Sequence, residues 1–210
     1  MKGKYKVLLS IIFVLILVVV IGIGIKSFSK KKVNNNSEEI NIPVLESIEK
    51  YGYSLHERDS VVMKETYEKL KEILNKDDID YEEYAKCLAK LFVIDLWTMN
   101  NKTNKYDVGG IEYIYPDNVA NYKINVENTV YKNIENNVDG KRKQELPAVK
   151  SITNIEVHND KFIIGDEETN SYVVSLMWDY DKDLEYENSA TITMIKKDDK
   201  LYIVEYVSGE

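Results

Sequence analysis

An uninterrupted apolar run near the amino terminus constrains this chain more than any other feature. The run covers Val7–Ile25 (VLLSIIFVLILVVVIGIGI), carries no charged side chain, and is interrupted only by Ser10, Gly22 and Gly24. As an α-helix it would be about 28 Å long, which is close to the thickness of the hydrocarbon core of a bilayer. Sixteen of its 19 residues are Leu, Ile, Val or Phe, so its insertion into lipid is favourable. We therefore predict a transmembrane helix here and the lipid bilayer as a partner of Val7–Ile25.

A cleaved secretory signal is the alternative interpretation of the same run, because lysines also precede it. The run is longer than the usual apolar region of a signal peptide, which has about 7 to 15 residues. The sequence after Ile25 reads KSFSKKK and contains no small-x-small cleavage site, and no cysteine follows that would indicate a lipoprotein. We therefore expect the segment to be retained as an anchor.

The charges beside the run do not determine its orientation, because basic residues flank both of its ends. Long domains cross the membrane largely regardless of charge, and the amino-terminal tail is too short to be more than a stub. We therefore predict a cytoplasmic stub at residues 1–6 and a cell-membrane protein whose carboxy-terminal domain is extracytoplasmic. A basic and polar linker at residues 26–42 would join the anchor to one domain at residues 43–210.

The part of the chain after residue 32 is strongly acidic. It contains 21 basic and 36 acidic residues, a net formal charge of −15. Nucleic-acid binding requires a basic face that neutralises phosphates, and the local run Lys141–Lys143 is more typical of a solvated loop. The charge balance therefore excludes a nucleic-acid partner. The basic residues Lys30–Lys32 would instead lie at the lipid headgroups.

Two helices are predicted in the first half of the domain, after a short extended stretch at Ile48–His56. Asp59 or Ser60 can cap the first helix, whose apolar residues recur at helical spacing from Met63 to Leu74. The second helix begins at Asp80, where the D-x-x-E pattern indicates a capping box. It continues into LFVIDLWT and is apolar on nearly all sides, so we expect it to be the central helix of the core.

A third helix is predicted from Pro116, with an apolar face from Val119 to Ile134 and a stop at Asp139–Gly140. Before it, the polar connection at residues 100–111 ends in Gly109 and Gly110, which permit a positive φ or a close approach of the backbone. From Ala148 the hydrophobic period changes to two. This period predicts strands at about 148–157, 161–166, 171–181, 184–197 and 200–207, separated by HND, EETN, KD and DD turns.

Three helices followed by an antiparallel meander predict an α+β domain in which the helices pack on one face of a curved sheet. This order behind one anchor resembles the extracytoplasmic domains of type IV secretion and conjugation scaffold proteins, which have the cone-shaped fold of nuclear transport factor two and ketosteroid isomerase. LFVIDLWTMNNK and KYDVGG are also similar to segments of uncharacterised membrane proteins of low-GC Gram-positive bacteria. The resemblance implies a scaffold with envelope protein partners, and it assigns no catalytic residue.

Asp95 is the candidate catalytic residue, because it follows an apolar run on the second helix. A buried carboxylate can have its pKa raised far enough to act as a general base, as in the isomerase members of the cone-shaped fold. The alternative is a structural carboxylate that accepts hydrogen bonds from Asn100, Asn101 or Thr103 near the helix end. This second interpretation is the favoured one.

Asp179, Asp181 and Asp183 are the candidate metal ligands, since they alternate like the start of a calcium loop and Glu187 could add a fourth ligand. The pattern lacks the glycine at the sixth position and the glutamate at the twelfth. A hairpin turn with solvated carboxylates is therefore the favoured interpretation.

Other catalytic and cofactor motifs are missing from the sequence. His56 and His158 lack partners at zinc spacing, and Cys87 fits a buried thiol better than a nucleophile. There is no G-x-G-x-x-G, P-loop, H-E-x-x-H or G-x-S-x-G motif. We therefore expect no cofactor and favour a non-enzymatic scaffold or assembly protein of the cell envelope. The alternatives are a small-ligand-binding or isomerase-like domain that uses the interior of the cone, and a sensor or sporulation-type envelope factor.

Overall fold

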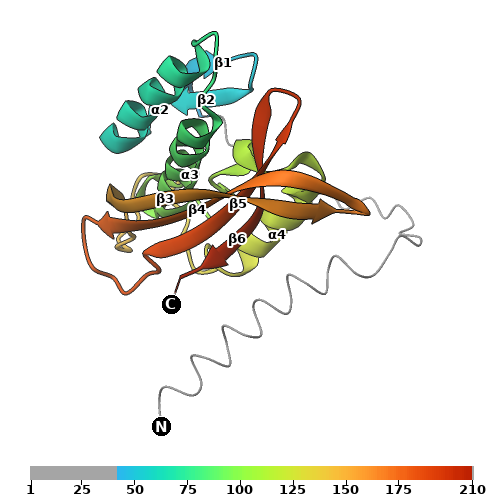
Figure 1. Cartoon of the computed structure of the whole chain (residues 1–210). Coiled ribbons are helices and arrows are strands. Elements are labelled where there is room, and N and C mark those ends of the chain that lie inside the picture. The colour runs from blue at the N-terminus through green and yellow to red at the C-terminus, as the bar shows by residue number, and fades with distance from the viewer. Residues whose placement is uncertain (1–41, 210) are drawn as a thin grey trace, which may run out of the picture. The chain divides into compact units, whose positions relative to one another are not determined.

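The computed structural model describes residues 42–209, which form an α+β fold (Figure 1). In the described part, three α-helices precede a four-stranded antiparallel sheet of order β3-β4-β5-β6. This confirms three helices followed by an antiparallel meander, but the meander has four strands and not the five that the sequence predicts. A two-stranded hairpin, β1-β2, comes before the helices. The elements are β1 Val44–Ile48, β2 Tyr53–His56, α2 Val61–Leu74, α3 Tyr81–Trp97, α4 Val119–Asn128, β3 Val149–Ile164, β4 Glu167–Tyr180, β5 Ser189–Lys197 and β6 Lys200–Ser208, with single 3₁₀ turns at η1 Met99–Asn101, η2 Ile111–Tyr113 and η3 Pro116–Asn118.

The predicted anchor, its cytoplasmic stub and most of the linker lie outside the described residues. Within residues 42–209, no helix combines the length and the apolar composition that are needed to cross a bilayer.

The starts of α2 and α3 are where the sequence predicts them. The Ser60 hydroxyl accepts the backbone N–H of Met63 at 3.3 Å. The Asp80 carboxylate accepts two backbone N–H groups of the first turn of α3, each at 3.1 Å. The reciprocal half of the predicted capping box is not formed, because the Glu83 carboxylate pairs with Lys86 instead. Each helix nevertheless has a side-chain acceptor for its free amides.

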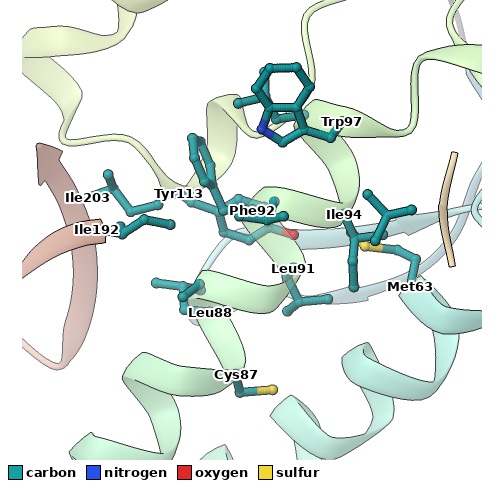
Figure 2. Packing of buried hydrophobic residues seen from close by; sticks show 14 of the residues in the cluster. Met63, Cys87, Leu88, Leu91, Phe92, Ile94, Trp97, Tyr113, Ile192 and Ile203 are labelled. Carbon is teal, nitrogen blue, oxygen red and sulfur yellow. The ribbon is translucent and has the colours of Figure 1, made fainter. Parts of the chain in front are cut away.

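Helix α3 is the central helix of the core, as predicted. All four residues from Leu91 to Ile94 are buried, so the helix is covered on every side in its second half. Figure 2 shows Leu88 facing Ile192 and Ile203 of the sheet, while Met63 of α2 lies on the other side of the helix. The Trp97 ring lies 6.1 Å from the Trp178 ring on β4, measured between centroids. Helix α3 thus lies between most of α2 and the sheet, although α2 also contacts β3.

The two glycines after α3 have the roles that the sequence predicts. Gly110 has a φ of +77°, a conformation in which a side chain is strained. The backbone at Gly109 lies so close to the carbonyl group of Asp95 that a Cβ atom there would overlap it. The connection that follows α3 can therefore fold back onto the last turns of the same helix.

The third helix is shorter than predicted. After the 3₁₀ turn η3, helix α4 ends at Asn128, and it does not continue to Asp139–Gly140. The side chains of Asn128 and Thr129 donate to the carbonyl groups four residues earlier, at 2.8 and 2.6 Å. Such bonds compete with the helical ladder, which explains why the apolar period overestimates the helix. Ile134 is still buried in the core, although it lies in a turn.

Three of the predicted strand boundaries are also wrong. Strand β3 continues through HND, because each of these residues pairs with one of β4, for example His158 with Val173. The turn lies at Gly165–Asp166 rather than at EETN, since Gly165 has the positive φ, +61°. Strand β5 begins at Ser189, so residues 181–188 form a loop and not the start of a strand. The Ile48–His56 stretch is a turn followed by β2, and β1 precedes it.

The four-stranded sheet has an inner face that contacts the helices and an outer face on the opposite side. On β4 the inner residues Val174, Leu176 and Trp178 are buried, and the outer residues Ser175 and Met177 between them are exposed. Strand β5 pairs with β4 only from Ser171 to Met177. The tip of the β3-β4 hairpin, residues 161–170, therefore extends beyond the end of β5, and we call it the β3-β4 arm.

Candidate functional site

Asp95 lies in the last turns of α3 and binds the loop that follows the helix. Its Oδ1 atom accepts a hydrogen bond from Lys102 Nζ at 2.5 Å, and its Oδ2 atom accepts the Gly110 N–H at 2.6 Å. The donors are thus Lys102 and Gly110, and not the residues Asn100, Asn101 and Thr103 that the sequence indicates. Because the Lys102 side chain is only 1% exposed, Asp95 is the counter-ion of a buried cation.

The charge of Lys102 determines the protonation of Asp95. Burial raises the pKa of the Asp95 carboxyl, but the adjacent Lys102 ammonium and the Gly110 N–H hold it below its ordinary value. A general base that works near neutral pH requires the opposite shift. The geometry therefore makes Asp95 a charged anchor for the loop at residues 98–112.

A second ion pair holds the same loop. Both terminal nitrogens of Arg58 donate to the carboxylate of Asp107, and the Thr103 N–H donates to it at 2.7 Å. Burial raises the pKa of Asp107, and the Arg58 guanidinium lowers it below the ordinary value. Arg58 also donates to the Asn101 carbonyl oxygen at 3.2 Å. The loop is therefore fixed to the segment between β2 and α2.

Glu112 is the third carboxylate in this region, and its surroundings differ from those of Asp95 and Asp107. It lies in η2 and accepts the backbone N–H of Ser54, on β2, at 3.1 Å. Lys200 donates to the carbonyl oxygen of Glu112 rather than to its carboxylate, and no cation pairs with that carboxylate in residues 42–209. Burial raises the pKa of Glu112 from its ordinary 4.5 to about 7. Sequence reasoning missed this residue, because nothing in IEY distinguishes it from a surface glutamate.

The three candidate metal ligands do not form a site. Asp179 is exposed on the outer side of β4, while Asp181 and Asp183 follow in the loop at residues 181–188. The carboxylate of Glu187 instead accepts a hydrogen bond from the Tyr206 hydroxyl. In the part of the chain that the structure describes, no three His, Cys, Asp or Glu side chains lie close enough together to hold a metal ion.

The remaining reactive side chains are also separate from one another. Cys87 is buried between α3 and α2, where its thiol donates to the Thr66 carbonyl oxygen (Figure 2). Burial raises the pKa of this thiol to about 12, so it is not a nucleophile. The Nδ1 atom of His56 lies 3.7 Å from Oδ2 of Asp59, and His158 is exposed on β3.

A cavity of about 270 Å³ lies where the loop after α4 meets Trp97 and Tyr186. Leu146 and Ile134 contribute further apolar surface. The polar side chains at its wall are occupied: Gln144 bonds to the backbone of the same loop, and Trp97 Nε1 donates to the Tyr206 hydroxyl at 3.2 Å. The wall also includes Thr129 and Asn133, so the cavity is of mixed polarity, and Asp95 does not line it.

The outer face of the sheet carries apolar side chains among serines and threonines. Ile195 lies on this face and is 4% exposed, although it is not part of the main core. Met177 and Val207 are 45% and 38% exposed on the same face. Strand pairing places Val173 beside Thr193 and Ile195 beside Tyr202. The apolar side chains of the outer face are Phe162, Val173, Met177, Ile195, Tyr202 and Val207.

Comparisons of the chain with protein-family models, with curated proteins and with solved structures found no match. The relationship to secretion and conjugation scaffolds therefore stays a prediction.

Proposed function

We propose that this chain is a single-pass, non-enzymatic scaffold or assembly protein of the bacterial cell envelope, whose extracytoplasmic domain binds other envelope proteins. The observation that carries the proposal is the apolar outer face of the sheet. An antiparallel sheet with one covered face normally presents polar residues on the other. Here Met177 and Val207 are exposed at one end of the outer face, and Ile195 is buried nearer its other end. Exposed apolar surface with a polar rim is typical of a protein interaction site.

The charged residues of the domain support a binding role. Asp95 and Asp107 are engaged with Lys102 and Arg58, and these pairs fix one loop to α3 and to the segment between β2 and α2. Carboxylates with lowered pKa values serve as anchors and not as bases near neutral pH. We infer that this network maintains the shape of the domain, while the outer face makes the contacts.

The proposal includes the finer features that the sequence predicts. These are a transmembrane helix at Val7–Ile25, a cone-shaped fold related to that of nuclear transport factor two, and a place in a conjugation or secretion machine. Support comes from the order of the elements, three helices followed by a four-stranded antiparallel meander. A curved sheet that wraps around a central helix such as α3 is compatible with the cone.

The location can be tested with a single introduced thiol. Cys87 is buried, so the full-length chain with Ser175→Cys would have one accessible thiol, on the outer face. We expect a membrane-impermeant maleimide to label this variant in intact protoplasts and to leave the unmodified chain unlabelled. Labelling that occurs only after lysis, or a mature chain found free in the medium, would contradict the proposed location.

Partner binding can be tested by photocrosslinking in living cells. A photoreactive phenylalanine analogue replaces Met177 on the outer face or, as the control, the exposed Glu72 on α2. We expect a discrete adduct with one envelope protein from Met177 and none from Glu72. If Met177 gives no adduct, or if both positions give the same adducts, the outer face is not the binding surface.

Binding of a small ligand is a second candidate function, and the cavity beside Trp97 favours it. Its volume of about 270 Å³ and its wall of aromatic and polar side chains fit a small aromatic compound with a polar group. With 4-nitrophenol as the probe and the full-length chain in lipid nanodiscs, this function predicts saturable quenching of Trp97 fluorescence in the Trp178→Phe background. Adding Leu146→Phe, which fills the cavity, should abolish the saturation. Quenching that is linear and equal in both variants would exclude this function.

A further inference from the structure

The charged side chains on the outer face are predominantly acidic. Strand register places five exposed carboxylates on this side of the sheet. Two lysines also lie at the β5-β6 end of this face: Lys197 Nζ lies 5.0 Å from the centre of the Tyr115 ring, and Lys200 donates to backbone carbonyl groups. The apolar side chains of the outer face are thus bordered by more negative than positive charge. The five carboxylates belong to Glu156, Asp160, Glu167, Asp179 and Glu205.

Three of the hydroxyls between the apolar side chains are hydrogen-bonded, whereas the buried Ser171 hydroxyl beside Ile195 has no partner within residues 42–209. The hydroxyls of Ser175 and Thr191 lie 3.1 Å apart across β4 and β5. Thr193 donates to the Glu205 carboxylate at 2.9 Å, across β5 and β6. Burying a polar group is costly when it loses its hydrogen bonds, and these groups would keep theirs under a partner. The centre of the outer face can therefore be covered without leaving these hydroxyls unpaired.

The negative border discriminates among the surfaces that could cover this face. A second copy of the chain would bring two acidic borders together, and a membrane surface with anionic lipids would also be repelled. A surface with Lys or Arg around an apolar centre would complement both the border and the centre. We propose that the outer face binds a protein partner whose contact surface is apolar in the middle and basic at its edge. This inference rests on the proposed scaffold function and specifies the chemistry of the partner.

The two parts of such a surface have different effects on binding. Opposite charges at the edge mainly accelerate association and select among partners, and salt screens them. Apolar contacts at the centre mainly determine how slowly the complex dissociates. Binding should therefore weaken with ionic strength, and it should also depend on Met177.

The test uses the full-length chain in phosphatidylcholine nanodiscs and two synthetic peptides that differ only in the sign of their charges. The peptides are KKVTVYVTVKK and EEVTVYVTVEE, and binding is measured by surface plasmon resonance. We expect the basic peptide to bind about tenfold or more tightly than the acidic one, and its affinity to fall as salt is added. The variant Met177→Lys should reduce its affinity about tenfold. The control Asn75→Lys, which makes the same charge change at the exposed end of α2, should not.

Several results would overturn the inference. Equal binding of the two peptides, or no binding of either, would contradict the proposal of a partner with a basic edge. If Met177→Lys and Asn75→Lys changed the peptide affinity equally, and thermal melting showed both variants to be folded, the outer face would be excluded as the binding surface. A dimer that sedimentation detects and that Met177→Lys dissociates would identify a second copy as the occupant. A crosslinked partner at Met177 without a peptide preference would retain the scaffold function and reject only the charge complementarity.

Discussion

Lys102 determines the chemistry of the residues around it, because its ammonium is almost fully buried. The sequence indicated Asp95 as an unusual carboxylate, since it follows an apolar run, but it gave no indication of its partner. Lys102 belongs to the polar stretch NNKTNK, which is typical of a solvated loop. It is buried because the chain folds back at Gly109–Gly110 onto α3. That contact depends on tertiary structure, which local patterns do not report.

Asp95→Asn should lower the stability of the domain by about 3 kcal/mol, because it leaves a buried ammonium without a counter-ion. Thermal melting of the full-length chain in detergent measures the loss. The double variant Asp95→Asn, Lys102→Met removes both charges and should recover most of it. An unchanged melting temperature in Asp95→Asn would instead support the general-base interpretation.

Glu112 should make the domain less stable as the pH rises. Its pKa is about 7 in the folded domain and near 4.5 in the unfolded chain, so the folded state holds more protons between these values. The contribution of Glu112 to stability is therefore full below about pH 4.5 and is lost as the pH rises through about 7.

The variant Glu112→Gln mimics the protonated form and should be more stable than the unmodified chain at about pH 8, by roughly 2 kcal/mol. Near pH 4 the Glu112→Gln variant and the unmodified chain should have the same melting temperature. The exposed Glu72→Gln on α2 is the control. If Glu112→Gln changed stability equally at both pH values, Glu112 would not be the titrating group.

At the scale of elements, the starts of α2 and α3 were predictable from the sequence, and the end of α4 and the start of β5 were not. Ser60 and Asp80 cap α2 and α3 through bonds to residues two or three positions away, so the signal is local. Helix α4 ends where the Asn128 and Thr129 side chains bond to the helix backbone, although the apolar period continues to Ile134. The period indicates which residues face the core, and it does not distinguish a helix from a packed loop.

Arg142 should control the order of the segment between α4 and β3. Its guanidinium donates to the carbonyl oxygens of Lys102 and Asn100 at 2.8 and 2.7 Å. Arg142→Ala removes these bonds, so we expect endoproteinase Lys-C to cleave at Lys141 and Lys143 about tenfold faster. The control variant Glu135→Gln, in the same segment, should be cleaved at the same rate as the unmodified chain. Equal rates in both variants would show that Arg142 does not hold the segment.

At the scale of the whole molecule, the α+β class was predictable because the α-helices and the four strands of the main sheet occupy separate halves of the domain. The apolar outer face was not predictable. Along β4, the outer residues Val173, Ser175 and Met177 resemble the solvent side of an ordinary strand. Their apolar neighbours, such as Ile195 and Tyr202, come from other strands and are known only from the register. The surface on which the proposed function rests is therefore a product of strand pairing.

The length of the β3-β4 arm has a consequence for how the domain opens. Residues 161–170 pair only with each other, since the pairing of β4 with β5 stops at Ser171. Their amides should exchange with deuterium within seconds to minutes, whereas those of the buried Val174 and Ile192 should exchange only on global opening. Mass spectrometry of pepsin fragments separates the two classes, and equal rates would contradict the prediction. Faster exchange in the arm would mean that the β3-β4 arm opens independently, while the amides in the rest of the sheet stay hydrogen-bonded.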